Sequence, residues 1–517
     1  MTTASAPGAG EDIAALAKGG RTNFFGFLIR LAARLPFLFI AGQLYGPELL
    51  GRFAYAVIII EFAAQLATLG LKRGLAQQLS STDQPHVCIV MDAILAALIA
   101  SAAATAILMV FPQAMFPRGG MYGAEWLLPL VIFGIAGADI ALAALAYRHD
   151  IAATVKARAI VEPWTISIAA GLLWFVSARD GLIFAYVVSV AAGLLASLWP
   201  LYRSYGMPRG WKPNPQQLLY VARQNIPLAA ADAIEWGSRR LDIGILGLFV
   251  EPYYVGVYYV AQQIASLPQK LKTSFDPILA PVISQRLREG DKKAVAQQVR
   301  QVGFWVIAAQ AAVALALGIP GEAVMGTVGH EFIGGTGALA FLLAAEVVAA
   351  TAAVSEAALV YVARHRNLMI STLMIAVQAV LTVGVILGMK SLGRPETWQA
   401  AGAALSLMLA LGLASVLKAR LLCRLLDAPV QGWRWPLIWA AAGATVVGWL
   451  FTLLPPWLTW LELSLGVASI MLTFGFIVWK RGFTHEDRVL FRMKKVPEPG
   501  LPPPTGVTPP GAEPPGA

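Results

Sequence analysis

Residues 28–56 read LIRLAARLPFLFIAGQLYGPELLGRFAYA, and residues 233–261 read AIEWGSRRLDIGILGLFVEPYYVGVYYVA. An offset of 205 residues aligns the two stretches, and both then contain the pattern R-x7-G-x4-P-x3-G. The order of the matches, and their place at the start of two similar apolar blocks, predict an internal duplication. The aligned pairs are Arg34 with Arg239, Gly42 with Gly247, Pro47 with Pro252, Gly51 with Gly256 and Ala56 with Ala261.

The composition is typical of a membrane protein. Of the 517 residues 58% are hydrophobic and 13% are charged, and the mean hydropathy is +0.66, whereas soluble domains contain roughly 45–50% apolar residues. Apolar runs recur that are long enough to cross a hydrocarbon core about 30 Å thick, so we expect an all-α polytopic membrane protein with about 14 transmembrane helices. The predicted spans are 23–45, 49–72, 87–111, 124–147, 159–178, 181–202, 222–250, 253–277, 299–319, 337–363, 368–389, 398–420, 435–454 and 457–479.

The distribution of Lys and Arg predicts the orientation of these spans, because cytoplasmic loops carry an excess of basic residues. Most of the 39 basic residues fall in alternate connections, beginning with the N-terminal segment, which places both termini in the cytoplasm. The net charge of +10 then reflects orientation and contact with anionic membrane lipids rather than nucleic-acid binding. The outer connections carry Arg118, Arg179, Lys390 and Arg394.

The duplication and the spans together predict two six-helix bundles. Both bundles begin on the cytoplasmic side, so the repeats are parallel and related by an axis along the membrane normal, as in some secondary transporters. The interface between the repeats should then hold the substrate path. The expected parts are a cytoplasmic N-terminal segment (1–22), the first bundle (23–203), a cytoplasmic linker (204–221), the second bundle (222–426), two additional transmembrane helices (427–480) and a cytoplasmic tail (481–517) that is Pro-rich and disordered from about 496.

Catalytic and metal-binding patterns are absent from the sequence, and every predicted outer connection is short. No P-loop, GxSxG motif or paired acidic motif is found, so we expect a transporter rather than an enzyme, with no catalytic residue and no cofactor. The five histidines stand in separate loops without the spacing that a metal site needs. They are His86, His149, His330, His365 and His485.

Charged residues inside the predicted spans are the candidates for function, because each costs about 2.5–3.5 kcal/mol at a helix centre unless it faces protein or water. Glu235, Arg239 and Asp242 are spaced by four and three residues, so they share one helix face, whereas Arg240 points elsewhere. In the first span, Arg30 and Arg34 form a similar stripe. An alternative is that Glu235 and Arg239 neutralise each other and that Asp242 shares the same arginine.

Three stretches resemble a known family: LYGPELLGRFAYAVIIIEFAAQLATLGLKRGLAQQLS (44–80), RRLDIGILGLFVEPYYVGVYYVAQQIASLP (239–268) and GEAVMGTVGHEFIGGTGALAFLLAAE (321–346). They are similar to segments of the oligosaccharide and O-antigen flippases of bacterial polysaccharide biosynthesis. These belong to the multidrug/oligosaccharidyl-lipid/polysaccharide (MOP) exporter superfamily, together with multidrug exporters and the lipid II flippase. The resemblance implies two six-helix bundles that work by alternating access. Many O-antigen members have twelve spans, and the two further spans expected here are a feature of the lipid II flippases.

The resemblance also implies a function in the bacterial inner membrane. The protein would flip an undecaprenyl-diphosphate-linked oligosaccharide from the cytoplasmic to the outer leaflet for O-antigen, capsule or exopolysaccharide synthesis. Polysaccharide polymerase or assembly proteins would be its partners. Arginines would suit the diphosphate of the substrate, and intramembrane acids would suit coupling to H⁺ or Na⁺ and to the membrane potential. Three alternatives stay open: a lipid II flippase, a multidrug exporter of the same fold, and a membrane-embedded polysaccharide polymerase or ligase. The candidate diphosphate-binding residues are Arg30, Arg34 and Arg239, and the candidate ion-coupling residues are Glu61, Glu235 and Asp242, with Asp139 and Glu356 as weaker ones.

Overall fold

A computed structural model describes residues 9–81, 84–208, 210–273 and 283–484, apart from the side chains of residues 9–34 and of a few other helical residues. The predicted tail beyond residue 484 lies outside the described part. All regular structure in the described ranges is helical, which confirms the all-α class. Within these described ranges, ten helical segments are long and apolar enough to cross a membrane. The chain is therefore a multi-pass membrane protein.

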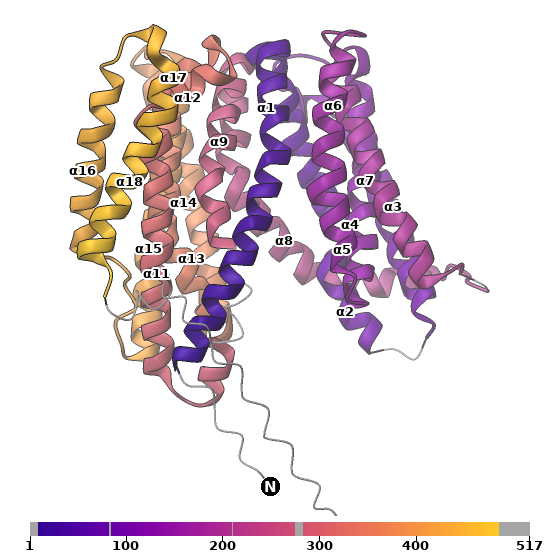
Figure 1. Ribbon diagram of the computed structural model, residues 1–517. Coiled ribbons are helices and arrows are strands. Elements are labelled where there is room, and N and C mark those ends of the chain that lie inside the picture. The colour runs from indigo at the N-terminus through magenta and orange to yellow at the C-terminus, as the bar shows by residue number, and fades with distance from the viewer. Residues whose placement is uncertain (1–8, 82–83, 209, 274–282, 485–517) are drawn as a thin grey trace, which may run out of the picture.

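In its described residues, the first half of the chain forms seven α-helices, joined by turns and by short 3-10 or π-helical segments (Figure 1). Helices α1 and α2 are followed by α3, and two 3-10 turns lead from α3 into α4; a π-helical segment joins α5 to α6. The bounds are α1 (Ala9–Ala67), α2 (Leu71–Ser80), α3 (His86–Val110), η1 (Pro112–Ala114), η2 (Gly123–Leu130), α4 (Val131–Tyr147), α5 (Ile151–Val155), η3 (Lys156–Val161), α6 (Glu162–Trp174) and α7 (Gly181–Tyr205).

The second half continues with longer helices and ends in a further helix pair. The bounds are α8 (Pro215–Phe249), α9 (Pro252–Thr273), α11 (Lys292–Gly318), α12 (Gly321–Val328), η4 (His330–Gly335), α13 (Thr336–Val362), α14 (Arg364–Ser391), α15 (Glu396–Leu426), α16 (Trp435–Thr452), η5 (Pro456–Leu458), α17 (Thr459–Leu461), η6 (Glu462–Gly466), α18 (Val467–Ile477) and η7 (Val478–Gly482).

Helix α1 contains the turn between the first two predicted spans. Its backbone leaves the helical conformation at Gly46, with φ 73° and ψ 174°, and Pro47 follows. A positive φ favours glycine because glycine has no Cβ. The first predicted span, 23–45, thus ends next to Gly46. The second, predicted over 49–72, is helical as far as Ala67, and a turn separates it from α2. Helices α8, α9 and η3–α6 also cover predicted spans but are not among the ten apolar segments, so the count of fourteen crossings stays a prediction.

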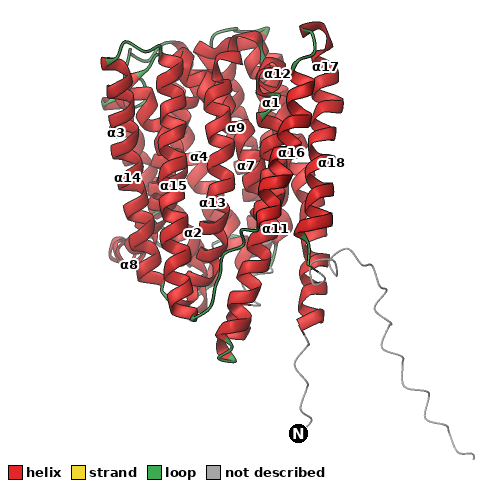
Figure 2. Cartoon of the chain, turned by 90° about the vertical axis from the view of Figure 1, so that its left-hand side faces the viewer, coloured by secondary structure: helices red, strands yellow, loops and turns green. Residues whose placement is uncertain are grey.

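The two halves stand side by side in Figure 1, with α1 between them. Helices α2–α7 lie on one side and α9–α18 on the other, and α8 crosses obliquely from the region of α2 toward α9. Figure 2 shows that most helices run nearly parallel. Much of the contact between the halves is therefore made by α1 and α8.

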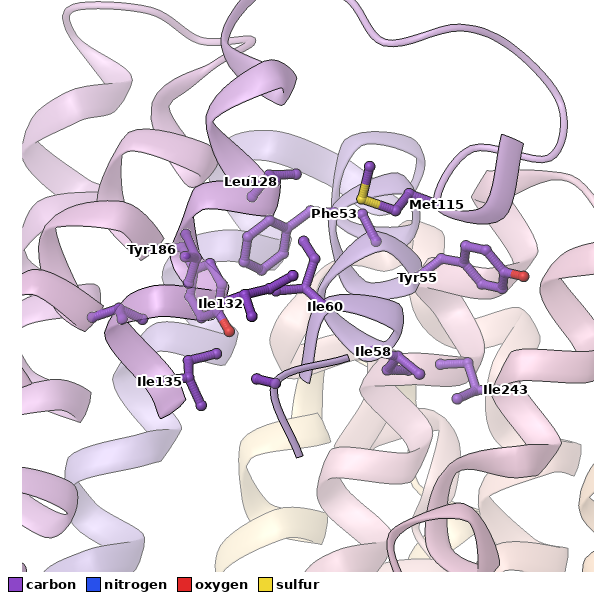
Figure 3. Close-up of a cluster of buried hydrophobic side chains, with 14 of the residues drawn as sticks. Phe53, Tyr55, Ile58, Ile60, Met115, Leu128, Ile132, Ile135, Tyr186 and Ile243 are labelled. Carbon is purple, nitrogen blue, oxygen red and sulfur yellow. The ribbon is translucent and has the colours of Figure 1, made fainter. Parts of the chain in front are cut away.

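A buried apolar cluster surrounds the part of α1 that follows Gly46 (Figure 3). The rings of Phe53 and Tyr186 meet edge to face, with centroids 5.6 Å apart. Ile243 on α8 belongs to the same cluster as residues of the first half. The core thus extends from the first half across α1 to the second. Other members labelled in Figure 3 are Tyr55, Ile58, Ile60, Met115, Leu128, Ile132 and Ile135.

Residues paired by the sequence repeat touch each other where α1 crosses α9. A Cβ added to Gly51 would overlap the carbonyl oxygen of Pro252, and one added to Gly256 would overlap the carbonyl oxygen of Pro47. Gly51 aligns with Gly256, and Pro47 aligns with Pro252, so the contact is reciprocal. This reciprocity is what a two-fold relation between the two helix pairs produces.

We expect Gly51→Ala and Gly256→Ala each to destabilise the protein, since overpacking a tight contact costs about 1–3 kcal/mol. The apparent Tm of the purified protein in detergent would fall in both variants. Gly384→Ala on α14 is the matched control, because a Cβ there meets no atom within 4 Å. Equal Tm values for the three variants would contradict the close approach.

Candidate functional site

Two arginines and two acids form a cluster between α2 and α8. Arg73 Nε lies 2.8 Å from Asp232 Oδ1, and Arg73 Nη2 lies 2.5 Å from Glu235 Oε2. The other oxygen of Glu235 lies 3.6 Å from Arg239 Nη2. The side chains of Arg73, Glu235 and Arg239 are 50%, 52% and 52% exposed, whereas that of Asp232 is only 5% exposed. We call these four residues the α2–α8 charge cluster.

The structure thus brings together Glu235 and Arg239, two of the residues singled out in the sequence, and adds two others. The neutralisation of Glu235 by Arg239 is present, but Arg73 is the closer partner of Glu235. Arg73 directly follows the second predicted span and is not among the candidate site residues of the sequence. Helix α8 passes obliquely by the region of α2 (Figure 1), and Glu235 on α8 thereby meets Arg73 on α2.

The signals for the two missed residues are present in the sequence. Asp232 lies three residues before Glu235 on the same helix, so the two acids share a face. Arg73 follows the second predicted span. Local spacing does not show that α2 faces α8. Only this contact between the helices brings Arg73 to the two acids.

Asp242 lies in a separate, fully buried site between α8 and α9. Tyr258 donates a hydrogen bond of 2.5 Å to Asp242 Oδ2, and Gln262 Nε2 donates one of 3.0 Å to the same oxygen. Arg240 Nη1 donates to Gln262 Oε1 at 3.4 Å. The face predicted for Glu235, Arg239 and Asp242 is therefore divided between two sites, and Asp242 is held directly by uncharged donors.

The remaining predicted site residues lie on α1. The side chains of Arg30 and Arg34 are outside the described residues, although the helix runs through both positions. Glu61 is partly buried, and the next residue, Phe62, packs against Trp236 of α8 with ring centroids 5.1 Å apart. Glu61 therefore lies close in sequence to a contact between α1 and α8.

Within each half, an acid inside one helix is neutralised by a basic residue from another segment. In the first half, Asp139 on α4 pairs with Arg158 and, at 3.4 Å, with Lys72 Nζ. In the second half, Glu356 Oε2 on α13 lies 3.0 Å from the buried Nζ of Lys418 on α15. These paired acids, the weaker candidates for ion coupling, each link helices within one half.

Other contacts connect the two halves at the opposite end of the molecule. Arg52 on α1 makes a bidentate pair with Glu125, at 2.5 and 2.8 Å, and also lies over the ring of Phe116. Arg118 donates a hydrogen bond to the carbonyl oxygen of Phe249 at the end of α8. The loop between α3 and η2 is thereby fixed both to α1 and to the second half.

No group of three or more His, Cys, Asp or Glu residues in the described ranges is arranged to hold a metal ion. The charged groups described above can instead bind ions through side-chain pairing. In particular, guanidinium groups that are half exposed can bind carboxylate or phosphate oxygens.

Comparison with known proteins identifies both a family and a fold. The family described as "Polysaccharide biosynthesis protein" matches residues 42–316. None of the curated protein sequences compared matches the chain. Solved structures match it at low identity, which shows the fold alone.

Three of these structures are transporters. An inward-facing multidrug resistance MATE family transporter of the MOP superfamily is 14% identical, with a TM-score of 0.62, and the match covers 78% of this chain and 98% of that one. The lipid II flippase MurJ in an inward closed conformation is 12% identical, with a TM-score of 0.64, covering 88% and 98%. A MOP superfamily transporter from Pyrococcus furiosus is 13% identical, with a TM-score of 0.54, covering 83% and 99%. The fold is thus that of MOP superfamily transporters.

Tyr258→Phe should lower the stability of the protein, because it leaves the buried Asp242 carboxylate without its phenolic donor. The expected cost is about 1–3 kcal/mol, measured as a lower apparent Tm in detergent. Tyr254→Phe, one turn earlier on α9, is the control. If both substitutions had the same small effect, the assignment of Tyr258 as a supporting donor would be wrong.

A double-mutant cycle at Glu356 and Lys418 should show strong coupling. Glu356→Ala leaves a buried ammonium without its carboxylate, and breaking a buried pair costs about 3–5 kcal/mol; we expect a smaller loss because Glu356 is 43% exposed. Lys418→Met should cost less, and the double variant should be more stable than Glu356→Ala alone. Additive changes in the free energy of unfolding would show that the two residues act independently.

Proposed function

This chain belongs to the polysaccharide biosynthesis protein family, and from that premise we propose that it is a flippase for lipid-linked oligosaccharide. It moves an undecaprenyl-diphosphate-linked oligosaccharide from the cytoplasmic to the outer leaflet of the bacterial inner membrane. The product serves O-antigen, capsule or exopolysaccharide synthesis, where polymerase and assembly proteins would be partners. The family match and the transporter fold support this proposal.

The observation that carries the proposal is the position of Arg239. Its side chain is 52% exposed on α8, and α8 is a helix of the second half that contacts the first half. Guanidinium binds phosphate oxygens in a bidentate manner and keeps its charge at any physiological pH. Together with Arg30 and Arg34 on α1, Arg239 would bind the diphosphate as the polar head group passes between the halves, while the polyprenyl tail remains in lipid.

Transport of this anion has a physical driving force. A membrane potential that is negative inside assists outward movement by about 2.3 kcal/mol per charge per 100 mV. Coupling to H⁺ or Na⁺ would use the acids Glu61, Glu235 and Asp242. Asp242 is the strongest of these candidates, because it is fully buried and its hydrogen-bond donors are uncharged. A proton or cation there would change the charge inside the second half.

A second candidate function is transport of lipid II. It is favoured by the likeness to the lipid II flippase structure, which extends over 88% of this chain. Both candidates share the polyprenyl-diphosphate chemistry. A multidrug exporter of cationic drugs would need acidic residues in its binding site, whereas the binding site proposed for this protein contains arginines. A polymerase or ligase is less consistent with a fold shared with transporters.

Arg239→Ala and Arg34→Ala should each abolish surface polysaccharide in a strain that depends on this protein, because each removes a diphosphate ligand. The measurement is surface glycan after complementation, with protein level in the membrane checked by immunoblot. Arg366→Ala, at an exposed position in the α14 N-terminal turn, is the control and should be fully active. Normal polysaccharide with Arg34 and Arg239 both replaced would contradict the proposed binding site.

Mass spectrometry of a depletion strain distinguishes the candidate substrates. Accumulation of a polyprenyl-diphosphate oligosaccharide in viable cells supports the proposed function. Accumulation of lipid II with arrest of growth supports the second candidate. Increased drug susceptibility without either lipid would refute both.

A further inference from the structure

The contact between α2 and α8 joins the two halves on the predicted cytoplasmic side. A Cβ added to Gly70 would come within 2.5 Å of Ala229 N, and one added to Gly74 would overlap the side-chain oxygen of Asn225. The helix backbones are therefore in close contact. Beside them, Gln217 Nε2 donates a hydrogen bond of 3.1 Å to Gln84 Oε1, which lies in the loop after α2.

Within this contact, the α2–α8 charge cluster supplies the ion pairs. Arg73 is the one residue of the cluster on α2, and it holds Asp232 and Glu235, which are both on α8. Glu235 is shared with Arg239. The second oxygen of Asp232 is buried without a hydrogen-bond partner among the described residues. Among the described residues, Arg73 is the residue of α2 that lies within ion-pair distance of acids on α8.

The guanidinium of Arg73 is accessible to a competing anion. Half of the Arg73 side chain is exposed while its ion pairs with Asp232 and Glu235 are intact. The side chain of Arg239 is also half exposed while it pairs with Glu235. Carboxylate and phosphate both bind guanidinium in a bidentate manner, so they compete for the same N–H groups. A diphosphate offers more charge and more acceptor oxygens than either carboxylate.

We propose that Arg73, Asp232 and Glu235 form a latch that the diphosphate of the substrate opens. The diphosphate takes Arg73 and Arg239 from the two carboxylates, and α8 then separates from α2 on the cytoplasmic side. Arg73 is thus a further substrate-binding residue. In the absence of substrate, the two carboxylates occupy the position on Arg73 that the diphosphate would take. This inference rests on the proposed function, since it requires a diphosphate-linked substrate.

The contacts at the other end of the molecule are compatible with this movement. The crossing of Gly51 and Gly256 and the pairing of Arg52 with Glu125 involve neither α2 nor the N-terminal part of α8. The latch can therefore open while these contacts between the halves remain in place. Alternating access needs this independence of the two ends.

Cross-linking can measure the state of the latch in the full chain in nanodiscs. Cysteines would replace Gln84 and Gln217 in a background in which Cys88 and Cys423 are replaced by serine, and a short thiol-reactive cross-linker would join them when the latch is closed. Undecaprenyl diphosphate is the probe, and its binding is measured in parallel by native mass spectrometry. We expect it to lower the cross-linking rate on the order of tenfold, as for an ordinary coupling between two sites.

Variants of the latch should reproduce the open state. Asp232→Asn with Glu235→Gln should cross-link slowly even without the probe, and the probe should have little further effect. Arg73→Gln should also cross-link slowly, and it should bind the probe more weakly than the wild type. Arg223→Gln, at an exposed position of α8, is the matched control and should behave as the wild type.

The outcomes separate the latch from the proposed function. Binding of the probe with unchanged cross-linking in the wild type would overturn the latch and leave the proposed function standing. Fast cross-linking in the Asp232→Asn, Glu235→Gln variant would also overturn the latch. Absence of probe binding would refute the proposed function and the latch together.

Discussion

Charge pairing inside an apolar environment determines how this protein is assembled. A charged group near the centre of a span costs about 2.5–3.5 kcal/mol unless it meets a partner or water. Asp139 meets this requirement in the first half by pairing with Arg158, and Glu356 meets it in the second half by pairing with Lys418. Between the halves, the buried Asp232 pairs with Arg73. Because the partners come from different helices, each charge that would be unfavourable on its own specifies which helices pack together.

The all-α class, the helix ranges and the repeat could be predicted because they depend on local properties. Apolar length is read directly from the chain, and the aligned residues Gly51 and Gly256 do meet. The partners of the charged residues could be predicted only in part. A shared face grouped Glu235 with Asp242, yet one contacts α2 and the other contacts α9. A helix face is a property of one helix, whereas a partner depends on the neighbouring helix.

Adjacent residues on α2 have different roles for the same reason. Lys72 and Arg73 are about 100° apart around the helix axis, so Lys72 reaches Asp139 on α4 while Arg73 reaches α8. Helix α2 is thereby attached to the first half by one residue and to the second half by the next. A rotation of α2 would change both attachments at once, which links the interior of the first half to the contact between the halves.

The reciprocal crossing of α1 and α9 also restricts how the sequence can change. A side chain at Gly51 would overlap a backbone atom of Pro252, and one at Gly256 would overlap a backbone atom of Pro47. When a large residue meets a side chain, a smaller residue at the partner position can restore the fit. Here the obstacle is a carbonyl oxygen, which every amino acid carries. A genetic screen for second-site suppressors of a Gly51 substitution should therefore recover changes that move a whole helix, and not a compensating exchange at the opposite position.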